Sequence, residues 1–249
     1  MTSSDFIPLG DISLPRILIE EKDFLIVYKP PGMHSAPLAR SAEADTLFDW
    51  CVLRFPEIAD VPGRKAGEGG LLHRLDYETQ GLLLIARTGA GMESLLEQQR
   101  DGRMLKEYSA LTLIRKTALP GFPGAFAKEC GAGHVQIKSA FRPFGPGRKA
   151  VRPVLSGEQY RTEILETHPR ANGITAFRVR IVRGFRHQIR CHLAWLGMPI
   201  LNDNLYGGES FGGGFLGLRA CSLLFTDPAS GAERAFSICP LEPETIAGP

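Results

Sequence analysis

The chain has 249 residues, with 29 Lys and Arg against 27 Asp and Glu, and 43% of its residues are hydrophobic. This apolar share excludes wholesale disorder, and a chain of this length can bury a sizeable core without disulfides or metals. No run of 18 apolar residues is present, which excludes a membrane-spanning helix, and residues 1–10 lack the basic and apolar regions of a secretory signal.

The five cysteines are odd in number, widely spaced and free of any C-x-x-C pair: Cys51, Cys130, Cys191, Cys221 and Cys239. This pattern argues against a disulfide scaffold or a zinc ribbon and favours a reducing, cytoplasmic setting. His134 and His192 each lie near a cysteine, but no second pair at ligand spacing follows. We therefore expect ordinary thiols and no metal.

The net charge of +2 does not by itself indicate a nucleic-acid partner, but the distribution of charge is more informative. Residues 170–192, called the arginine block from here on, contain two histidines and no Asp or Glu. The block holds six arginines: Arg170, Arg178, Arg180, Arg183, Arg186 and Arg190. An acid-free stretch of this kind predicts an electropositive surface for an anionic partner.

Up to residue 114 the pattern predicts strands and helices in irregular order. The expected elements are a loose lead-in over residues 1–15, a strand over 24–28, a turn at 29–32, a loop over 38–44, a helix over 46–55 capped by Asp45 or Thr46, a Gly-rich basic loop over 63–70, a wholly apolar strand over 82–86, a helix over 92–100 and a strand over 106–114.

Beyond residue 114 the expected elements are loops or a short hairpin over 120–153, a strand over 175–181, a helix over 187–196 ended by Gly197 and Pro199, and two strands within 218–240 around a turn at 227–231. In the strand over 175–181, Phe177, Val179 and Ile181 point to one side and the arginines to the other. Strands and helices mixed without a βαβ rhythm indicate an α+β fold in one piece.

Three residues could carry chemistry, and each also has an ordinary interpretation. Asp76 lies on a turn between apolar segments, where it could face a cleft with a cationic partner or could form an Asx turn. Tyr108 lies in an expected strand, where packing is the commoner use of tyrosine. Arg190 lies on an apolar helix, so it either extends to solvent or pairs with a buried acid.

Several common signatures are missing from the sequence. It contains no G-x-x-x-x-G-K-[ST] phosphate loop, no dinucleotide fingerprint and no G-x-S-x-G elbow. We therefore expect no bound cofactor.

Four ordered blocks of residues resemble one family. Residues 73–86, His-Arg-Leu-Asp-Tyr-Glu-Thr-Gln-Gly-Leu-Leu-Leu-Ile-Ala, resemble the central motif H-R-L-D-x-x-T-S-G-L-L-L-x-A of the RluA-type pseudouridine synthases. Residues 23–32, 106–111 and 184–193 resemble the K-P-x-G, K-x-Y-x-A-L and H-Q-I-R-x-H-L blocks, and residues 197–207 resemble the usual continuation. The resemblance covers roughly residues 20–240, and four blocks in order are far more specific than one.

The resemblance implies an N-terminal lead-in over residues 1–19 and one catalytic domain over residues 20–249. Its fold would be α+β, with a mixed, mainly antiparallel sheet, flanking helices and a central cleft. The S4 RNA-binding domain of many relatives is not expected, because only about 20 residues precede the first block. The implied activity converts specific uridines of structured RNA, rRNA or tRNA, to pseudouridine without cofactor or metal, in a cytoplasmic monomer that binds no membrane.

Residue by residue, the resemblance makes Asp76 the catalytic aspartate, Tyr108 the active-site tyrosine and Arg190 the arginine that pairs with the aspartate. Arg74 would fill the space left by the extruded target base. The residues expected to contact RNA are Arg74, His73, Arg178, Arg180, Arg186, His187 and Gln188.

The chain departs from the family pattern near these positions. Tyr77 and Glu78 replace the usual Arg-Asp, Gln80 replaces Ser, and Phe185-Arg186 replace Arg-Thr or Arg-Ser. These changes indicate an altered RNA preference.

Other functions remain open: an RNA-binding relative without catalysis, an RNA chaperone, or a glycosidase. A glycosidase needs a second acid near Asp76, for which only Glu78 is close in sequence.

Overall fold

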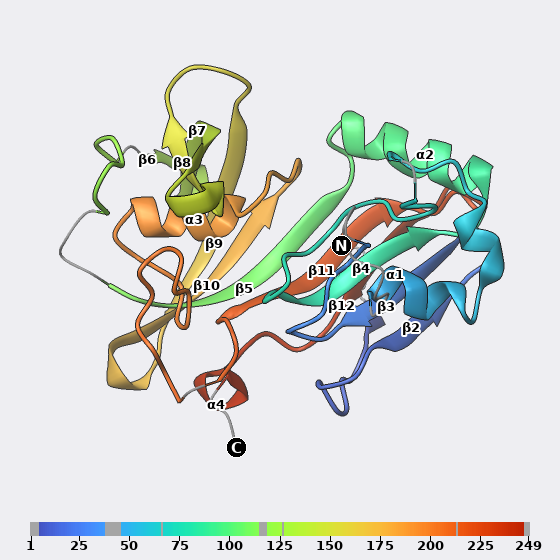
Figure 1. Cartoon of the computed structure of the whole chain (residues 1–249), viewed down its shortest axis with the longest axis horizontal. Coiled ribbons are helices and arrows are strands. Elements are labelled where there is room, and N and C mark those ends of the chain that lie inside the picture. The colour runs from blue at the N-terminus through green and yellow to red at the C-terminus, as the bar shows by residue number, and fades with distance from the viewer. Residues whose placement is uncertain are drawn as a thin grey trace. The chain divides into compact units, whose positions relative to one another are not determined.

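The computed structural model of the chain (Figure 1) describes residues 5–37, 46–65, 67–114, 119–125, 127–212 and 214–246. The loop predicted over residues 38–44 and the possible helix cap Asp45 lie outside the described residues. The chain forms two compact units. The first unit contains residues 1–106 and 220–239, and the second contains residues 107–219 and 240–249. Two strands, β5 (Leu105–Leu113) and β11 (Leu218–Thr226), contain residues of both units.

The first unit contains strands from both ends of the chain. They are β1 (Asp5–Phe6), β2 (Arg16–Glu20), β3 (Phe24–Lys29), β4 (Gln80–Ala86), most of β11, and β12 (Glu233–Ser237). They follow the order β2-β3-β4-β11-β12-β1. The pairs β2–β3, β3–β4 and β11–β12 are antiparallel, whereas β1–β12 is parallel. The lead-in predicted over residues 1–19 is thus partly ordered, because β1 and most of β2 lie within it.

The core of the first unit lies around β3 and β4, in which every residue is buried. Strands that are apolar along their whole length are typical of sheets covered on both faces. Phe24 packs edge-on against Phe225, with ring centroids 5.1 Å apart, and both belong to a cluster that includes Phe236.

Among its described residues, the first unit has two α-helices, α1 (Leu47–Val52) and α2 (Gly89–Arg100), and a 3-10 helix over Pro56–Ala59. Thr46 caps α1, since its hydroxyl accepts a hydrogen bond from the Asp49 amide at 3.2 Å, which confirms one of the two predicted caps. Helix α2 begins three residues earlier than predicted because Thr88 caps it through the Gly91 amide at 3.0 Å. Helix propensity does not predict this start, because the first turn contains glycines, which disfavour a helix.

The second unit contains most of β5 and five further strands. These are β6 (Ala127–Cys130), β7 (His134–Phe144), β8 (Ala150–Val154), β9 (Tyr160–Pro169) and β10 (Ile174–Ile181). Their order is β5-β10-β9-β7-β6, with β8 also paired to β7. The pairs β9–β10, β7–β9, β6–β7 and β7–β8 are antiparallel. The helices of this unit are α3 (Gln188–Trp195) and α4 (Pro243–Ile246).

The prediction of loops or a short hairpin over residues 120–153 was wrong for most of its length. Strand β7 alone spans 11 residues. The glycines do mark turns: Gly145, at a φ of +76°, separates β7 from β8. The prolines are tolerated because Pro153 lies on β8, which pairs only with β7 among the described strands and so has an edge where a missing N–H costs little.

The predictions for β10 and α3 are confirmed. Phe177, Val179 and Ile181 are buried and Arg178 is exposed, as the alternation requires. Helix α3 is followed by Gly197 at a φ of +76°, the left-handed position that ends many helices. All eight residues of α3 are buried, so this helix is enclosed rather than half exposed. Together, the mixed but mainly antiparallel strand pairs and the few helices confirm the α+β class.

Gly81 gives a stability test for the turn that enters β4. Its φ is +124°, and a Cβ built there would lie 2.3 Å from the Ala220 carbonyl oxygen. We expect Gly81→Ala to lower the free energy of unfolding by about 3 kcal/mol, measured by urea denaturation. Gly89→Ala is the matched control, because its nearest neighbour would be 3.9 Å away, and it should change stability by less than about 0.5 kcal/mol. Equal stabilities of the two variants would contradict this interpretation.

Candidate functional site

Asp76 lies in the first unit, in the turn that leads into β4, and is half-buried. Its carbonyl oxygen accepts a hydrogen bond from the Thr79 amide at 3.1 Å, which closes the turn. The preceding residue, Leu75, is held by Ser35: the serine hydroxyl donates to the Leu75 carbonyl at 2.8 Å and accepts from its amide at 3.0 Å. A buried serine thus fixes the backbone directly before the proposed catalytic carboxylate.

Lys29, at the end of β3, is fully buried beside this turn. Its ammonium group donates hydrogen bonds at 2.8, 2.7 and 3.2 Å to three carbonyl oxygens, those of Pro30, Met33 and Tyr77. Desolvation lowers the pKa of Lys29 to about 7, and the negative charges of Asp76 and Glu78 oppose that shift. The structure therefore places a cation of unusually low pKa near Asp76.

His73 and Arg74 precede Asp76 and differ in their surroundings. The His73 Nε2 accepts a hydrogen bond from the Leu84 amide at 3.3 Å. Desolvation, reinforced by the charges of Lys106 and Arg64, holds the pKa of His73 well below its usual value. His73 is thus a neutral ring that ties its segment to β4. The Arg74 side chain is 51% exposed and lies 3.3 Å from Glu68.

Arg190 lies on α3 in the second unit, where it forms a two-bond ion pair with Asp203. The guanidinium Nε lies 2.7 Å from one carboxylate oxygen and Nη2 lies 2.9 Å from the other. Both side chains are almost fully buried. Of the two interpretations of Arg190, the structure supports pairing with a buried acid, and Asp203 is one such acid. Its pairing with Asp76 stays a prediction.

Tyr206 frames the Arg190 side chain. The guanidinium carbon lies 5.7 Å from the centre of the tyrosine ring, within the range of a cation–π contact. The Tyr206 hydroxyl accepts a hydrogen bond from the Val151 amide at 2.8 Å and shares one with His187 Nδ1 at 3.2 Å. Tyr108 belongs to the same unit, on β5, and is 6% exposed.

Gln188, expected to contact RNA, is buried and hydrogen-bonded within the second unit. Its amide donates to the Arg161 carbonyl at 2.9 Å and to the Thr162 hydroxyl at 3.0 Å. Its side-chain oxygen accepts from the Phe185 amide at 3.0 Å. These bonds anchor the start of α3. His187, which precedes α3 at a φ of +55°, is half-buried.

Cys191 and His192 behave as core residues. The two ring nitrogens of His192 lie 2.9 Å from the Ser139 hydroxyl and 2.8 Å from the Thr162 hydroxyl, and burial lowers its pKa to about 3. The Cys191 thiol donates to the Val151 carbonyl at 3.5 Å. Cys51, Cys130 and Cys191 carry free thiols. Within the described ranges, no three His, Cys, Asp or Glu side chains gather as a metal site would require.

The arginine block is not the unneutralised surface that its sequence predicts. Arg178 and Arg180 both bind Glu107, and Arg178 also binds Glu166. Arg183 binds Glu158. The remaining acid partners are Glu242 for Arg170 and Asp203 for Arg190. These acids come from other strands and loops of the second unit, so a stretch free of acid in sequence is surrounded by acid in space.

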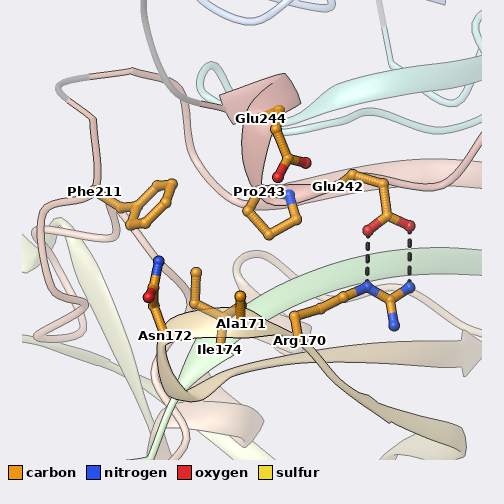
Figure 2. A pocket seen from close by; sticks show the side chains of 8 residues that line it. All are labelled: Arg170, Ala171, Asn172, Ile174, Phe211, Glu242, Pro243 and Glu244. Atoms are coloured by element: carbon orange, nitrogen blue, oxygen red, sulfur yellow. Dashed lines mark hydrogen bonds and ion pairs between the residues drawn. The ribbon is translucent and has the colours of Figure 1, made fainter.

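One of these ion pairs lines a hollow of about 340 Å³ at the C-terminal segment. Figure 2 shows Arg170 facing Glu242 through two interactions, at 2.8 and 3.0 Å. The lining residues are Arg170, Ala171, Asn172, Ile174, Phe211, Glu242, Pro243 and Glu244. None of them is a predicted site residue.

Three buried charged residues were not identified from the sequence. Lys29 stands in the K-P-P-G turn, and its position at the end of an apolar strand is the signal that could have marked it as buried. Asp203 is matched by the family's continuation, but nothing in its spacing shows that Arg190 is its partner. Arg219, at the start of the apolar strand β11, is 1% exposed and donates to the Pro240 carbonyl at 3.4 Å.

Comparison with known proteins bears on this arrangement. The family described as RNA pseudouridylate synthase matches residues 23–195, which is more than half of the chain. The chain belongs to this family. The matched region contains Asp76, Tyr108 and Arg190, the three positions carried over from the RluA-type motifs.

Curated members of the pseudouridine synthase family are similar over most of this chain. The ribosomal large subunit pseudouridine synthase D of Yersinia pestis is 31% identical over 193 residues, covering 78% of this chain and 53% of that protein. The protein of the same name from Escherichia coli K12 is 29% identical over 193 residues, with 78% and 52% covered. The chain thus spans about half the length of the curated relatives it matches.

A solved structure supports the fold of this pseudouridine synthase family member. Human RNA pseudouridylate synthase domain containing 1 matches with a TM-score of 0.62 at 22% identity, covering 94% of this chain and 86% of that one. Among the residues described, no helix is long and apolar enough to cross a membrane.

The buried ion pair of the second unit gives a prediction on stability. Asp203→Asn keeps the shape of the side chain but leaves the Arg190 charge without this counter-charge in the core. We expect a loss of about 3 kcal/mol in the free energy of unfolding, measured by urea denaturation. The control is Glu242→Gln, which weakens a two-bond pair whose side chains are 31% and 44% exposed, and it should cost less than about 1 kcal/mol. Equal losses in the two variants would show that burial does not determine how much stability is lost when an ion pair is broken.

The low pKa of Lys29 gives a prediction on pH. In the folded state Lys29 loses its proton near pH 7, whereas in the unfolded chain it does so near 10.5. Between these values the unfolded state binds more protons, so the free energy of unfolding should rise with pH relative to Lys29→Met. Denaturation curves from pH 6 to 10 measure this difference. Lys22→Met, at an exposed lysine of the same unit, should keep the slope of the unaltered protein, and an unchanged slope in Lys29→Met would contradict the prediction.

Proposed function

We propose that this chain converts uridine to pseudouridine in RNA, with large-subunit ribosomal RNA as the first candidate substrate. The observation that carries the proposal is Asp76, held half-buried in an anchored turn beside the buried cation Lys29, in a chain that belongs to the pseudouridylate synthase family. The names of the curated relatives support rRNA over tRNA. The cytoplasmic setting and the monomeric state remain predictions.

The reaction needs a carboxylate. It is an isomerisation, so the nucleoside is neither oxidised nor reduced. The bond between N1 of uracil and C1′ breaks, the detached base turns, and a bond between C5 and C1′ forms. The C5 proton then leaves, and N1 gains a proton. Asp76 would either attack C1′ or take the C2′ proton to give a glycal, and both routes require its ionised form.

The other residues would support Asp76 in this proposal. Tyr108 would stack on the uracil and help to remove the C5 proton. Arg190 would provide the charge partner of Asp76 that the family resemblance implies. Its orientation is already restricted by Asp203, because a two-bond pair fixes the plane of the guanidinium. In its charged form Lys29 adds a positive charge near Asp76.

The RNA contacts in the proposal rest on exposed cations. Arg74 and Arg186 have exposed side chains, and Arg74 would occupy the space of the flipped base. Arg178 and Arg180 would contact phosphate only in competition with Glu107. His187 remains a candidate for RNA contact, because it is only half-buried and part of it is accessible. His73 and Gln188 are better explained as positioning residues, because their polar atoms are engaged within their own units.

The test compares two carboxylates of one turn. Asp76→Asn should abolish the release of tritium from RNA labelled at C5 of uridine, because an amide is neither a base nor a nucleophile at neutral pH. Its binding to the same RNA in a filter assay should be largely kept. Glu78→Gln is the matched control and should still release tritium.

The outcomes separate the proposal from its alternatives. Tritium release by purified Asp76→Asn would remove Asp76 from the chemistry. An unaltered protein that retains RNA on the filter but releases no tritium would be a binding protein or a chaperone. Loss of activity in Glu78→Gln as well would point to a mechanism with two carboxylates.

A further inference from the structure

Tyr77 follows Asp76 directly and leaves a large aromatic surface in solvent. Its exposed fraction is 47%, although most large apolar side chains of the first unit are buried. The family motif usually has arginine here, so an aromatic ring beside the proposed catalytic residue is a departure from that motif. No role proposed above uses it.

The Tyr77 backbone is anchored at two points. Its carbonyl oxygen accepts a hydrogen bond from the Gly32 amide at 2.9 Å and another from the Lys29 ammonium at 3.2 Å. Gly32 adopts a φ of +74°, and a Cβ built on it would be 3.9 Å from the Tyr77 hydroxyl oxygen. The side chain therefore lies over the K-P-P-G turn with its hydroxyl near Gly32.

The His34 ring packs against the tyrosine ring. The two ring centroids are 4.6 Å apart, with the planes inclined by 44°. His34 is itself held, because its carbonyl oxygen accepts from the Leu47 amide at 2.9 Å, at the start of α1. Two aromatic rings from separate segments thus form one supported surface, called the aromatic step from here on, and Tyr77 is its exposed part.

The chemistry of this surface fits a nucleobase. A planar ring that is already ordered loses little conformational entropy on binding, and every base has a π-face that can stack on it. Arg74, three residues from Tyr77 along the chain, has a side chain that is 51% exposed and would exchange its ion pair with Glu68 for the phosphate backbone. A patch with both a flat aromatic face and a neighbouring arginine suits single-stranded RNA better than an apolar protein partner.

We propose that the aromatic step stacks on one base of the RNA that flanks the target uridine. The inference rests on the proposed function, because it takes RNA as the substrate. Where an arginine would hold the phosphate backbone, the tyrosine holds the face of one base and so positions the nucleotide beside the target uridine. Tyr77 is a positioning residue in this scheme and takes no part in the bond changes.

The test combines protein variants with RNAs that lack single bases. The probe is a fluorescein-labelled stem-loop of large-subunit ribosomal RNA from which the protein releases tritium, with each base beside the reacting uridine replaced in turn by an abasic nucleotide. Tyr77→Ala should weaken binding of the intact RNA by about 5- to 30-fold. At one flanking position the abasic RNA should bind the unaltered protein and Tyr77→Ala equally, because the same contact is already missing. Tyr77→Phe should bind normally, and Tyr77→Leu should resemble Ala.

Phe6→Ala is the matched control, since it removes an exposed aromatic ring from β1 of the same unit and should leave binding unchanged. Thermal melts check the folding of each variant. Normal binding by Tyr77→Ala would overturn the proposal. So would a loss that persists equally on every abasic RNA, because the lost contact would then not be to a base.

Failure of the proposed function can be distinguished from failure of this inference. If the unaltered protein releases no tritium from C5-labelled RNA, the proposed activity fails. Stacking is then judged with a 20-nucleotide oligouridylate as the probe. Weaker binding of that oligonucleotide by Tyr77→Ala, with Phe6→Ala unchanged, supports the aromatic step, and equal binding by all three proteins overturns it.

Discussion

Three carbonyl oxygens converge on the ammonium group of Lys29, and this contact joins the turn after β3 to the turn before β4. A charge removed from water is costly unless hydrogen bonds replace its hydration, and here backbone oxygens supply them. Because one of the three belongs to Tyr77, the same contact fixes the residue after Asp76. The location of the carboxylate and the orientation of the aromatic step both depend on this buried lysine. The low pKa of Lys29 reflects the cost of the arrangement.

The second unit is organised around a different buried charge. Arg190 and Asp203 satisfy each other in the core, with Tyr206 beside the guanidinium. Removing one partner of such a pair lowers stability far more than the intact pair raises it. The pair therefore specifies a geometry more than it adds stability. An arginine held in this way has its plane defined before any substrate arrives. That preorganisation is what the active-site role proposed for Arg190 requires.

Electrostatics illustrates the limit of local reasoning. The arginine block contains no acid over 23 residues, yet five of its six arginines pair with carboxylates. In antiparallel strands the neighbour of a residue is set by register, so Glu166 reaches Arg178 from the paired strand β9. The charge of a surface is therefore a property of paired segments. Arg74, outside the block, follows the same rule, since its exposed side chain lies 3.3 Å from Glu68.

The sequence by itself determined the α+β class, the strands β3, β4 and β10, the helix α3 and the family, since these depend on short-range periodicity and on ordered motifs. It also located Asp76, because a turn between two apolar runs is a local feature. It failed on β7, an 11-residue strand that lies in a region rich in glycine and proline, and gave no partner for Arg190. Only the tertiary structure decided that Lys29 is buried, that Asp203 binds Arg190 and that Tyr77 rests on His34. The pairs Lys29–Tyr77, Arg190–Asp203 and Tyr77–His34 each join residues that are distant in the chain, and such pairs are chosen by packing and by the need to satisfy buried polar groups.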